Sequence, residues 1–217
     1  MRYAYAYERG GELMRKLRAS AYPTAVLVDP SGTVVWKGHP GKLSDSIIES
    51  ALGSALTEPL WNWPKSGKKA RSFAGKREYG KAVAALAKIE EPWAKQATQS
   101  MQAMAKSWVE ASHAAFARGD YLAVSNDLGA YKKRLDGLEE ELASMEGLAN
   151  DLKKIKEASK VIKLQKKLAK LTETRINTRR DVSKLIEEVT AFMKKAEGTY
   201  AGTQAQEFID QLKSLLR

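Results

Sequence analysis

Residues 24–37 predict a β-hairpin, and no other stretch limits the possible folds of this chain as strongly. Residues 24–28 form an apolar, largely β-branched run without polar alternation, which is typical of a strand covered on both faces. Residues 29–32, Asp-Pro-Ser-Gly, have the residue order of a type I turn. Residues 33–37 alternate in character, as in a strand near a sheet edge. We therefore expect an antiparallel hairpin whose first strand is an inner strand.

Helices are expected on both sides of this hairpin. Ser44 can cap a helix N-terminus, and Leu43 and Ile48 occupy the two positions of a hydrophobic staple. Apolar residues continue at helical spacing up to Leu56. Residues 12–17 predict a short helix that follows a Gly-Gly break. The expected order is helix, strand, strand, helix.

This order resembles the C-terminal half of the thioredoxin-like domain in bacterial TlpA-type redoxins. The resemblance covers residues 3–56, and it rests on Pro-Thr at the head of the first strand, Asp-Pro-Ser-Gly at the turn and Gly-His-Pro after the second strand. It implies a cis Tyr22–Pro23 peptide bond. It also implies that Tyr22, Pro23 and Thr24 contact a peptide substrate, although the family has a smaller residue at the position of Tyr22.

The redox chemistry of that family requires cysteine, and this chain contains none. Because thiol–disulfide exchange proceeds by thiolate attack, we expect the 217 residues to be redox-inactive as they stand. In the family, a strand, a helix and a strand with Cys-x-x-Cys precede the half that the resemblance covers. We therefore expect an N-terminally truncated domain, from a misplaced gene start or a fragment. The alternative is a genuine remnant whose strand edge is covered by the helical region or by another chain.

The location of the protein stays open at this level. The resemblance implies an exported, periplasmic protein, with the export signal in the missing part. No segment here reads as a signal peptide, and none is apolar and long enough to cross a bilayer.

The character of the sequence changes after residue 57. Residues 58–64 form a proline-bounded aromatic connector, and residues 65–217 contain a single proline in a composition rich in Ala, Lys, Leu and Glu. The sequence thus divides into residues 1–57, 58–64 and 65–217. The expected fold class is α/β plus all-α: an incomplete thioredoxin-like half-domain followed by a helical-hairpin tail.

Two similar stretches, residues 77–82 and 118–123, resemble the turn and second-helix start of a tetratricopeptide-like hairpin. Each has a tyrosine, Tyr79 or Tyr121, that would pack against the preceding helix. The two tyrosines are 42 residues apart, which is longer than the usual period of that family. The sequence therefore predicts helical hairpins rather than a regular solenoid.

In the long helical stretch after residue 140, the apolar seam changes side near Ser159. Leu148 and Leu152 share one face, whereas Leu164 and Leu168 lie on nearly the opposite one. This change indicates a kink, a helix end or two different packing partners. Between the two seams, six lysines recur at steps of three and four: Lys153, Lys156, Lys160, Lys163, Lys167 and Lys170.

The lysine stripe allows two interpretations. With a net charge of +11, it could bind a polyanion, either nucleic acid or an anionic membrane surface, in a salt-sensitive and sequence-blind way. Alternatively, it is a solvated face that keeps the protein soluble. The excess of Lys over Arg and the lack of interleaved aromatic residues favour the second interpretation.

Other chemistry has little support in the sequence. His39 and His113 have no second ligand type at a metal-binding spacing, so we expect no metal site. Neither a nucleophile elbow nor a phosphate-binding loop is present, so we expect no cofactor. The sequence thus favours a non-catalytic binding or scaffold role of the helical tail for an unidentified protein partner. Polyanion binding is the alternative.

Overall fold

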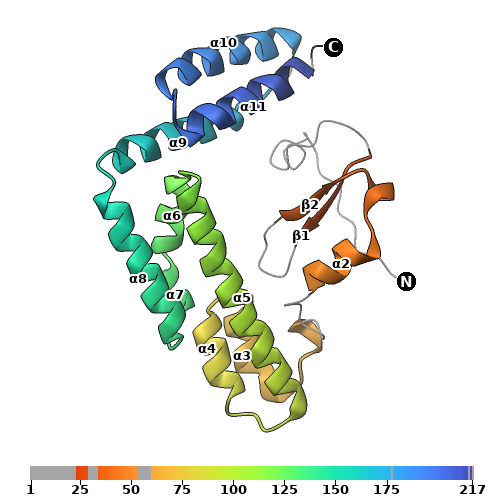
Figure 1. Ribbon diagram of the computed structural model, residues 1–217. Coiled ribbons are helices and arrows are strands. Elements are labelled where there is room, and N and C mark those ends of the chain that lie inside the picture. The colour runs from red at the N-terminus through yellow and green to blue at the C-terminus, as the bar shows by residue number, and fades with distance from the viewer. Residues whose placement is uncertain (1–22, 29–33, 53–59, 177, 215, 217) are drawn as a thin grey trace.

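The computed structural model describes residues 23–28, 34–52, 60–176, 178–214 and 216 of the chain. These residues are mostly helical, with one two-stranded antiparallel sheet. Figure 1 shows three parts: the hairpin with helix α2, a helical body of α3 to α8, and a second body of α9 to α11 that lies across one end of the first.

The predicted antiparallel hairpin is present. Strand β1 (Ala25–Val28) pairs with β2 (Val34–Gly38), with Ala25 opposite Gly38 and Val28 opposite Val34. The predicted turn at residues 29–32 lies outside the described residues. Within the described part of the chain, β1 pairs with no strand other than β2, and Val28 is 50% exposed. The described residues therefore do not confirm the predicted inner strand, since an apolar β-branched run reports β propensity and not the number of neighbouring strands.

Helix α2 (Asp45–Leu52) begins where the sequence predicts it. The Oγ of Ser44 accepts a hydrogen bond from the backbone N–H of Ile47 at 3.4 Å. A short 3₁₀ turn (Pro40–Lys42) precedes it, and there Nδ1 of His39 accepts a hydrogen bond from the N–H of Gly41 at 3.1 Å. The strand, strand, helix part of the predicted order is therefore confirmed. The helix predicted over residues 12–17 lies outside the described residues.

The region from residue 65 onward is mostly helical, as predicted. After two 3₁₀ turns (Leu60–Asn62 and Lys65–Gly67), its helices are α3 (Lys68–Gly75), α4 (Tyr79–Leu86), α5 (Pro92–Ala117), α6 (Tyr121–Leu128), α7 (Tyr131–Arg134), α8 (Glu139–Lys154), α9 (Ala158–Thr172), α10 (Arg179–Lys195) and α11 (Tyr200–Ser214).

Both predicted helical hairpins form, and a third of the same kind follows near the C-terminus. Helices α3 and α4, α5 and α6, and α10 and α11 pack against each other in pairs. In every pair, a residue with positive φ stands two positions before the tyrosine that begins the second helix: Arg77 (φ 56), Gly119 (φ 81) and Gly198 (φ 72). In the first two turns, backbone hydrogen bonds of the Schellman type satisfy the last carbonyl groups of the preceding helix.

The helical region has two hydrophobic cores. The first extends from Trp63 to Leu148, and the second from Leu168 to Leu212. The chain passes from one to the other at residues 155–157, between the end of α8 and the start of α9. Of the three explanations for the seam change near Ser159, the structure shows a helix end with a different packing partner on each side.

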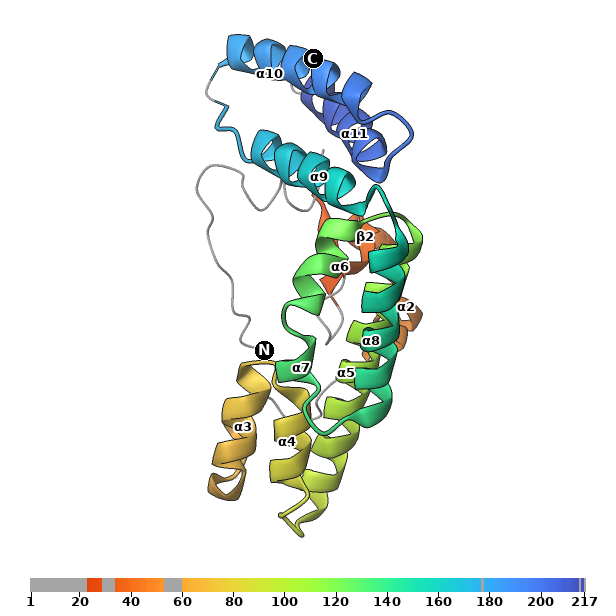
Figure 2. The ribbon, with the colours of Figure 1, turned by 90° about the vertical axis from the view of Figure 1, so that its left-hand side faces the viewer.

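A buried glutamine joins the two bodies. Gln165, on α9, is 5% exposed, and its Oε1 accepts a hydrogen bond from the N–H of Leu122 at 2.8 Å. Its Nε2 donates to the carbonyl oxygen of Gly119 at 3.0 Å. Because the first N–H groups of a helix have no partner within the helix, this side chain completes the start of α6. Figure 2 shows α9 above the end of the first body that carries α6.

Candidate interaction surfaces

The resemblance placed a peptide-contacting site at Tyr22, Pro23 and Thr24. Tyr22, and with it the Tyr22–Pro23 peptide bond, lies outside the described residues. Pro23 is exposed and Thr24 is half-buried, directly before β1. The predicted contact surface therefore stays a prediction.

A hollow of about 470 Å³ lies beside the hairpin. It is lined by Val35 and Trp36 of β2, by Ser107 of α5, and by the α2 residues Ser46, Ile47, Ser50 and Ala51. Its lining side chains carry no ionisable group, so they offer hydroxyl and apolar contacts but no acid, base or charged ligand.

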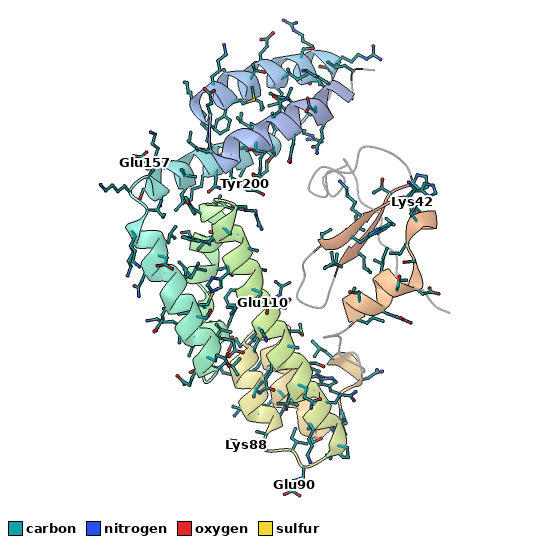
Figure 3. The ribbon with its side chains drawn as sticks, viewed as in Figure 1. Lys42, Lys88, Glu90, Glu110, Glu157 and Tyr200 are labelled. Carbon is teal, nitrogen blue, oxygen red and sulfur yellow. The ribbon has the colours of Figure 1, made fainter. Side chains whose placement is uncertain are left out.

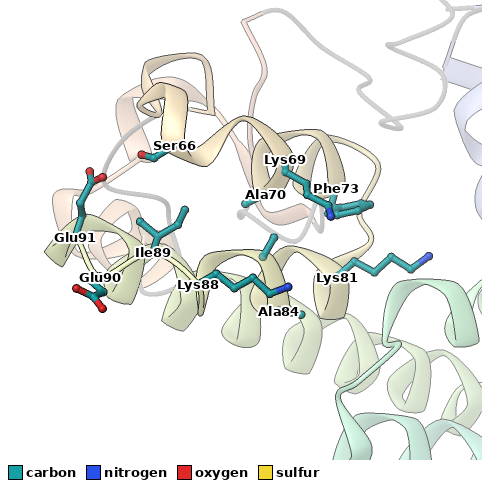
Figure 4. Close-up of a pocket in the computed structure, with 11 residues that line it drawn as sticks. Ser66, Lys69, Ala70, Phe73, Lys81, Ala84, Lys88, Ile89, Glu90 and Glu91 are labelled. Atoms are coloured by element: carbon teal, nitrogen blue, oxygen red, sulfur yellow. The ribbon is translucent and has the colours of Figure 1, made fainter.

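A larger groove of about 740 Å³ runs between α3 and α4 toward the start of α5 (Figure 4). Ala70, Phe73, Ala85 and Ile89 give it an apolar floor. We call this surface the α3–α4 groove. It forms because both helices bury one face in the first core while the sides next to the groove stay open.

Charged side chains are segregated along the α3–α4 groove. Glu90 and Glu91 lie at one end, whereas the amino groups of Lys69, Lys81 and Lys88 point toward the other part (Figure 4). Lys69 and Lys88 are exposed, and neither forms an ion pair with an acidic residue in the described part of the chain. A ligand in the groove would meet an apolar floor, an acidic end and two available ammonium groups.

Lys81 also belongs to an ion-pair cluster around Glu78, in the turn before α4. The Glu78 side chain is 7% exposed and lies 3.1 Å from Nζ of Lys133 and 3.5 Å from Nζ of Lys81. The hydrogen bond from Lys133, joined by the charges of both lysines, outweighs desolvation and lowers the pKa of Glu78 below its ordinary value. Glu78 is therefore committed to holding α4 against α7.

A second polar cluster, of Trp108, Ser112 and Asp127, is also structural. Asp127 accepts hydrogen bonds from Nε1 of Trp108 at 3.2 Å and from Oγ of Ser112 at 2.8 Å. Ser112 is fully buried, so its hydroxyl is not available to a substrate. These contacts tie α6 to α5.

The structure separates the predicted lysine stripe into two groups. Lys160, Lys163, Lys167 and Lys170 are exposed along one face of α9. Lys153 stands near the end of α8, and Lys156 lies in the corner that follows. Figure 3 labels the next residue of this corner, Glu157. Lys160 forms an ion pair with Glu157 at 3.1 Å.

The stripe is part of a wider basic region that helical spacing alone does not reveal. Residues 153–184 contain twelve Lys or Arg and three Asp or Glu, a net charge of +9. Six of these basic residues lie outside the six-lysine stripe: Lys154, Lys166, Arg175, Arg179, Arg180 and Lys184. A count of charge in a sliding window would have identified the region from the sequence.

The two histidines have hydrogen-bond partners of their own. His39 accepts from Gly41, and Nε2 of His113 lies 2.9 Å from Oγ of Ser144. Among the described residues, no three His, Asp or Glu side chains gather in a way that would hold a metal ion. No described helix combines the length and apolar character that a membrane span requires.

Comparisons of the chain with protein-family models, with curated proteins and with solved structures give no match. The functional proposals therefore depend on the residues and geometry of the chain itself.

Proposed function

We propose that this protein is a non-catalytic binding scaffold whose helical region holds a segment of a protein partner in the α3–α4 groove. The observation that carries the proposal is the groove of about 740 Å³, with its apolar floor and two lysines, Lys69 and Lys88, that form no ion pair with another described residue. This volume is within the range of about 300–1,000 Å³ that is usual for ligand-binding sites.

The groove also indicates the chemistry of the partner segment. Phe73 and Ile89 are half-buried, so a partner side chain can cover the rest of their apolar surface. Lys69 and Lys88 favour carboxylates in the same segment, since complementary charge steers encounter and fixes register. An amphipathic helix with apolar anchors on one face and acidic residues beside them meets both requirements.

The residue content of the chain supports a non-catalytic role. Its 217 residues include no cysteine and therefore supply no thiolate for disulfide exchange. The buried hydroxyl of Ser112, the ion-paired carboxylate of Glu78 and the hydrogen-bonded carboxylate of Asp127 are already used within the fold.

The binding test measures the affinity of the full chain for a fluorescein-labelled 12-residue amphipathic peptide that carries leucine and glutamate at helical spacing. A peptide with lysine in place of glutamate is the reference. We expect the acidic peptide to bind more tightly in fluorescence anisotropy. The double variant Lys69→Glu, Lys88→Glu should weaken it about tenfold, at about 0.5–1 kcal/mol for each charge pair.

A matched control reverses two exposed lysines of α5, Lys95→Glu and Lys106→Glu, which do not line the groove. This control changes the net charge equally and should leave the affinity within about twofold of the parent. Equal losses in both double variants, or equal affinity for the acidic and basic peptides, would contradict the proposed groove function.

We further propose that residues 3–56 derive from the C-terminal half of a thioredoxin-like domain. The antiparallel pairing of β1 with β2 and the capped start of α2 support this origin. The resemblance requires a cis Tyr22–Pro23 peptide bond, which the difference between the Cβ and Cγ chemical shifts of Pro23 reports directly in NMR. A trans value would contradict the proposed origin.

A further inference from the structure

We propose that the exposed face of α9 binds the phosphate backbone of duplex nucleic acid. The surface, here called the α9 basic ridge, consists of Lys160, Lys163, Lys167 and Lys170. At 1.5 Å per residue, these four side chains extend over about 15 Å of the helix. They lie on the side away from Leu168, which is 4% exposed and packs in the second core.

The charge of the α9 basic ridge is largely uncompensated. Helix α9 contains no acidic residue, and Glu157 and Glu173 flank it. The ion pair of Lys160 with Glu157 engages one of the four lysines. Within the described part of the chain, the other three make no ion pair.

The distribution of charge along the chain favours a binding role over simple solubility. Residues 153–184 carry +9 of the total net charge of +11, so the other 185 residues together carry +2. A charge that served only to keep the protein soluble would not need to be concentrated in this way, whereas a polyanion site requires it.

The side chains around the ridge select among polyanions. Residues 153–191 contain no Phe, Tyr or Trp, so they provide no stacking platform for single-stranded bases. No large apolar side chain on α9 is exposed, so the helix has nothing to insert into a bilayer. The contact must therefore depend on charge alone.

The shape of the basic region favours a linear partner over a flat one. Figures 1 and 2 show that α8 and α9 run in different directions on either side of residues 155–157, so Lys153 does not continue the row on α9. A row of about 15 Å faces about nine phosphate charges of a duplex, since the duplex carries one charge per about 1.7 Å of axis.

The test uses the full chain and a fluorescein-labelled 20-base-pair DNA duplex, with fluorescence anisotropy between 50 and 200 mM NaCl. Four phosphate contacts predict a slope of about −3.6 for log K against log salt concentration, which is about a 150-fold loss of affinity over this range. Duplexes of unrelated sequence should bind equally well.

The triple variant Lys163→Gln, Lys167→Gln, Lys170→Gln retains one ridge lysine. Its slope should fall to about −0.9, which is a loss of about three- to fourfold over the same range. The control is Lys42→Gln, Lys95→Gln, Lys106→Gln, which removes the same net charge from exposed sites elsewhere and should keep the parent slope. Circular dichroism checks that both variants retain their helical content.

Three outcomes overturn the inference. Equal slopes for the two triple variants, or no binding at 50 mM NaCl to either the duplex or vesicles of phosphatidylglycerol and phosphatidylcholine, would leave the ridge as a solvated helix face. Binding to the vesicles without binding to the duplex would make an anionic membrane the partner. The groove proposal is unaffected by any of these outcomes, because its peptide assay does not involve α9.

Discussion

Gly80 should not tolerate the addition of a single methyl group. It is the second residue of α4, and a Cβ atom built on it would lie 2.0 Å from the carbonyl oxygen of Asp136. Ordinary contacts begin at 3.4 Å, so α4 and the turn between α7 and α8 would have to separate by 1.4 Å. Both partners are backbone, so no side chain can rotate away. The neighbouring Tyr79 is 1% exposed, so such a separation would loosen the first core.

The expected size of the effect follows from two opposing contributions. Alanine is favoured over glycine in a helix by about 0.8–1.0 kcal/mol. Forcing extra atoms into a packed site costs about 1–3 kcal/mol, and the rigid contact in this structure places Gly80→Ala at the upper end. We therefore expect a net destabilisation of about 2 kcal/mol, equivalent to a melting temperature lower by about 4–8 °C.

The same substitution at Gly147 is the matched control. Gly147 is exposed in the middle of α8, and a Cβ atom there would meet nothing within 4 Å. Gly147→Ala should stabilise the protein by about 0.8–1.0 kcal/mol, so the two glycines should respond with opposite signs. Urea unfolding followed by circular dichroism at 222 nm measures both variants. A neutral or stabilising Gly80→Ala would refute the close approach of α4 to Asp136.

Four other substitutions test the turns and polar contacts of the helical region, each by urea unfolding against the parent. Arg77→Gly should stabilise the protein by about 0.5–1 kcal/mol, because glycine adopts the left-handed backbone conformation of this position without strain. Gly119→Ala at the equivalent position should destabilise the protein by about 1 kcal/mol. Equal effects of the two substitutions would contradict the shared turn geometry. Gln165→Ala should cost about 1–3 kcal/mol, because it leaves the N–H of Leu122 and a carbonyl group without their partner; a loss below about 0.5 kcal/mol would contradict this role. Because folding lowers the pKa of Glu78, the unfolded chain binds the Glu78 proton at a higher pH than the folded protein does. The stability gained from the ion pairs of Glu78 is therefore complete well above the ordinary pKa of 4.5. It is lost as the pH falls through the lower folded-state pKa. Glu78→Gln should therefore reduce the difference in stability between pH 7 and pH 3, and an unchanged difference would contradict the ion-pair assignment.

The sequence predicted those helices and strands that are determined by interactions between residues close together in the chain. The hairpin follows from an apolar run beside turn residues, and the start of α2 follows from the hydroxyl of Ser44. The helices that begin at Tyr79 and Tyr121 follow from turn chemistry that spans three residues. The seam change near Ser159 indicated a kink, a helix end or two packing partners, and in the structure α8 ends at Lys154 and α9 begins at Ala158.

Features that depend on distant parts of the chain could not be predicted in this way. Gln165 reads as a surface residue on a lysine-rich helix, yet its partners lie 43 and 46 positions away in the sequence. From the sequence alone, Gly80 is expected only to weaken a helix. In the structure, its missing side chain allows the backbone of Asp136 to approach α4 closely. Arg77 adopts the conformation that sequence rules assign to glycine, because the packing of α4 on α3 fixes the turn. The α3–α4 groove has the same origin, since its lining comes together only when the two helices pack.

The two proposed surfaces belong to different cores and lie toward opposite ends of the helical region. Lys88, at the α3–α4 groove, and Glu157, beside the α9 basic ridge, mark these ends in Figure 3. Substitutions at distant sites without shared partners have additive effects, so groove variants should leave duplex affinity unchanged and ridge variants should leave peptide affinity unchanged. The charge-matched controls remove the contribution that the two surfaces do share, which is the net charge of the protein. Any remaining cross-effect would cross the contacts between the two bodies, which include Gln165 against α6 and Arg118 over the ring of Tyr200. The part carried by Gln165 should disappear in Gln165→Ala. Such a result would make the junction a coupling element between two binding surfaces and not merely a structural contact.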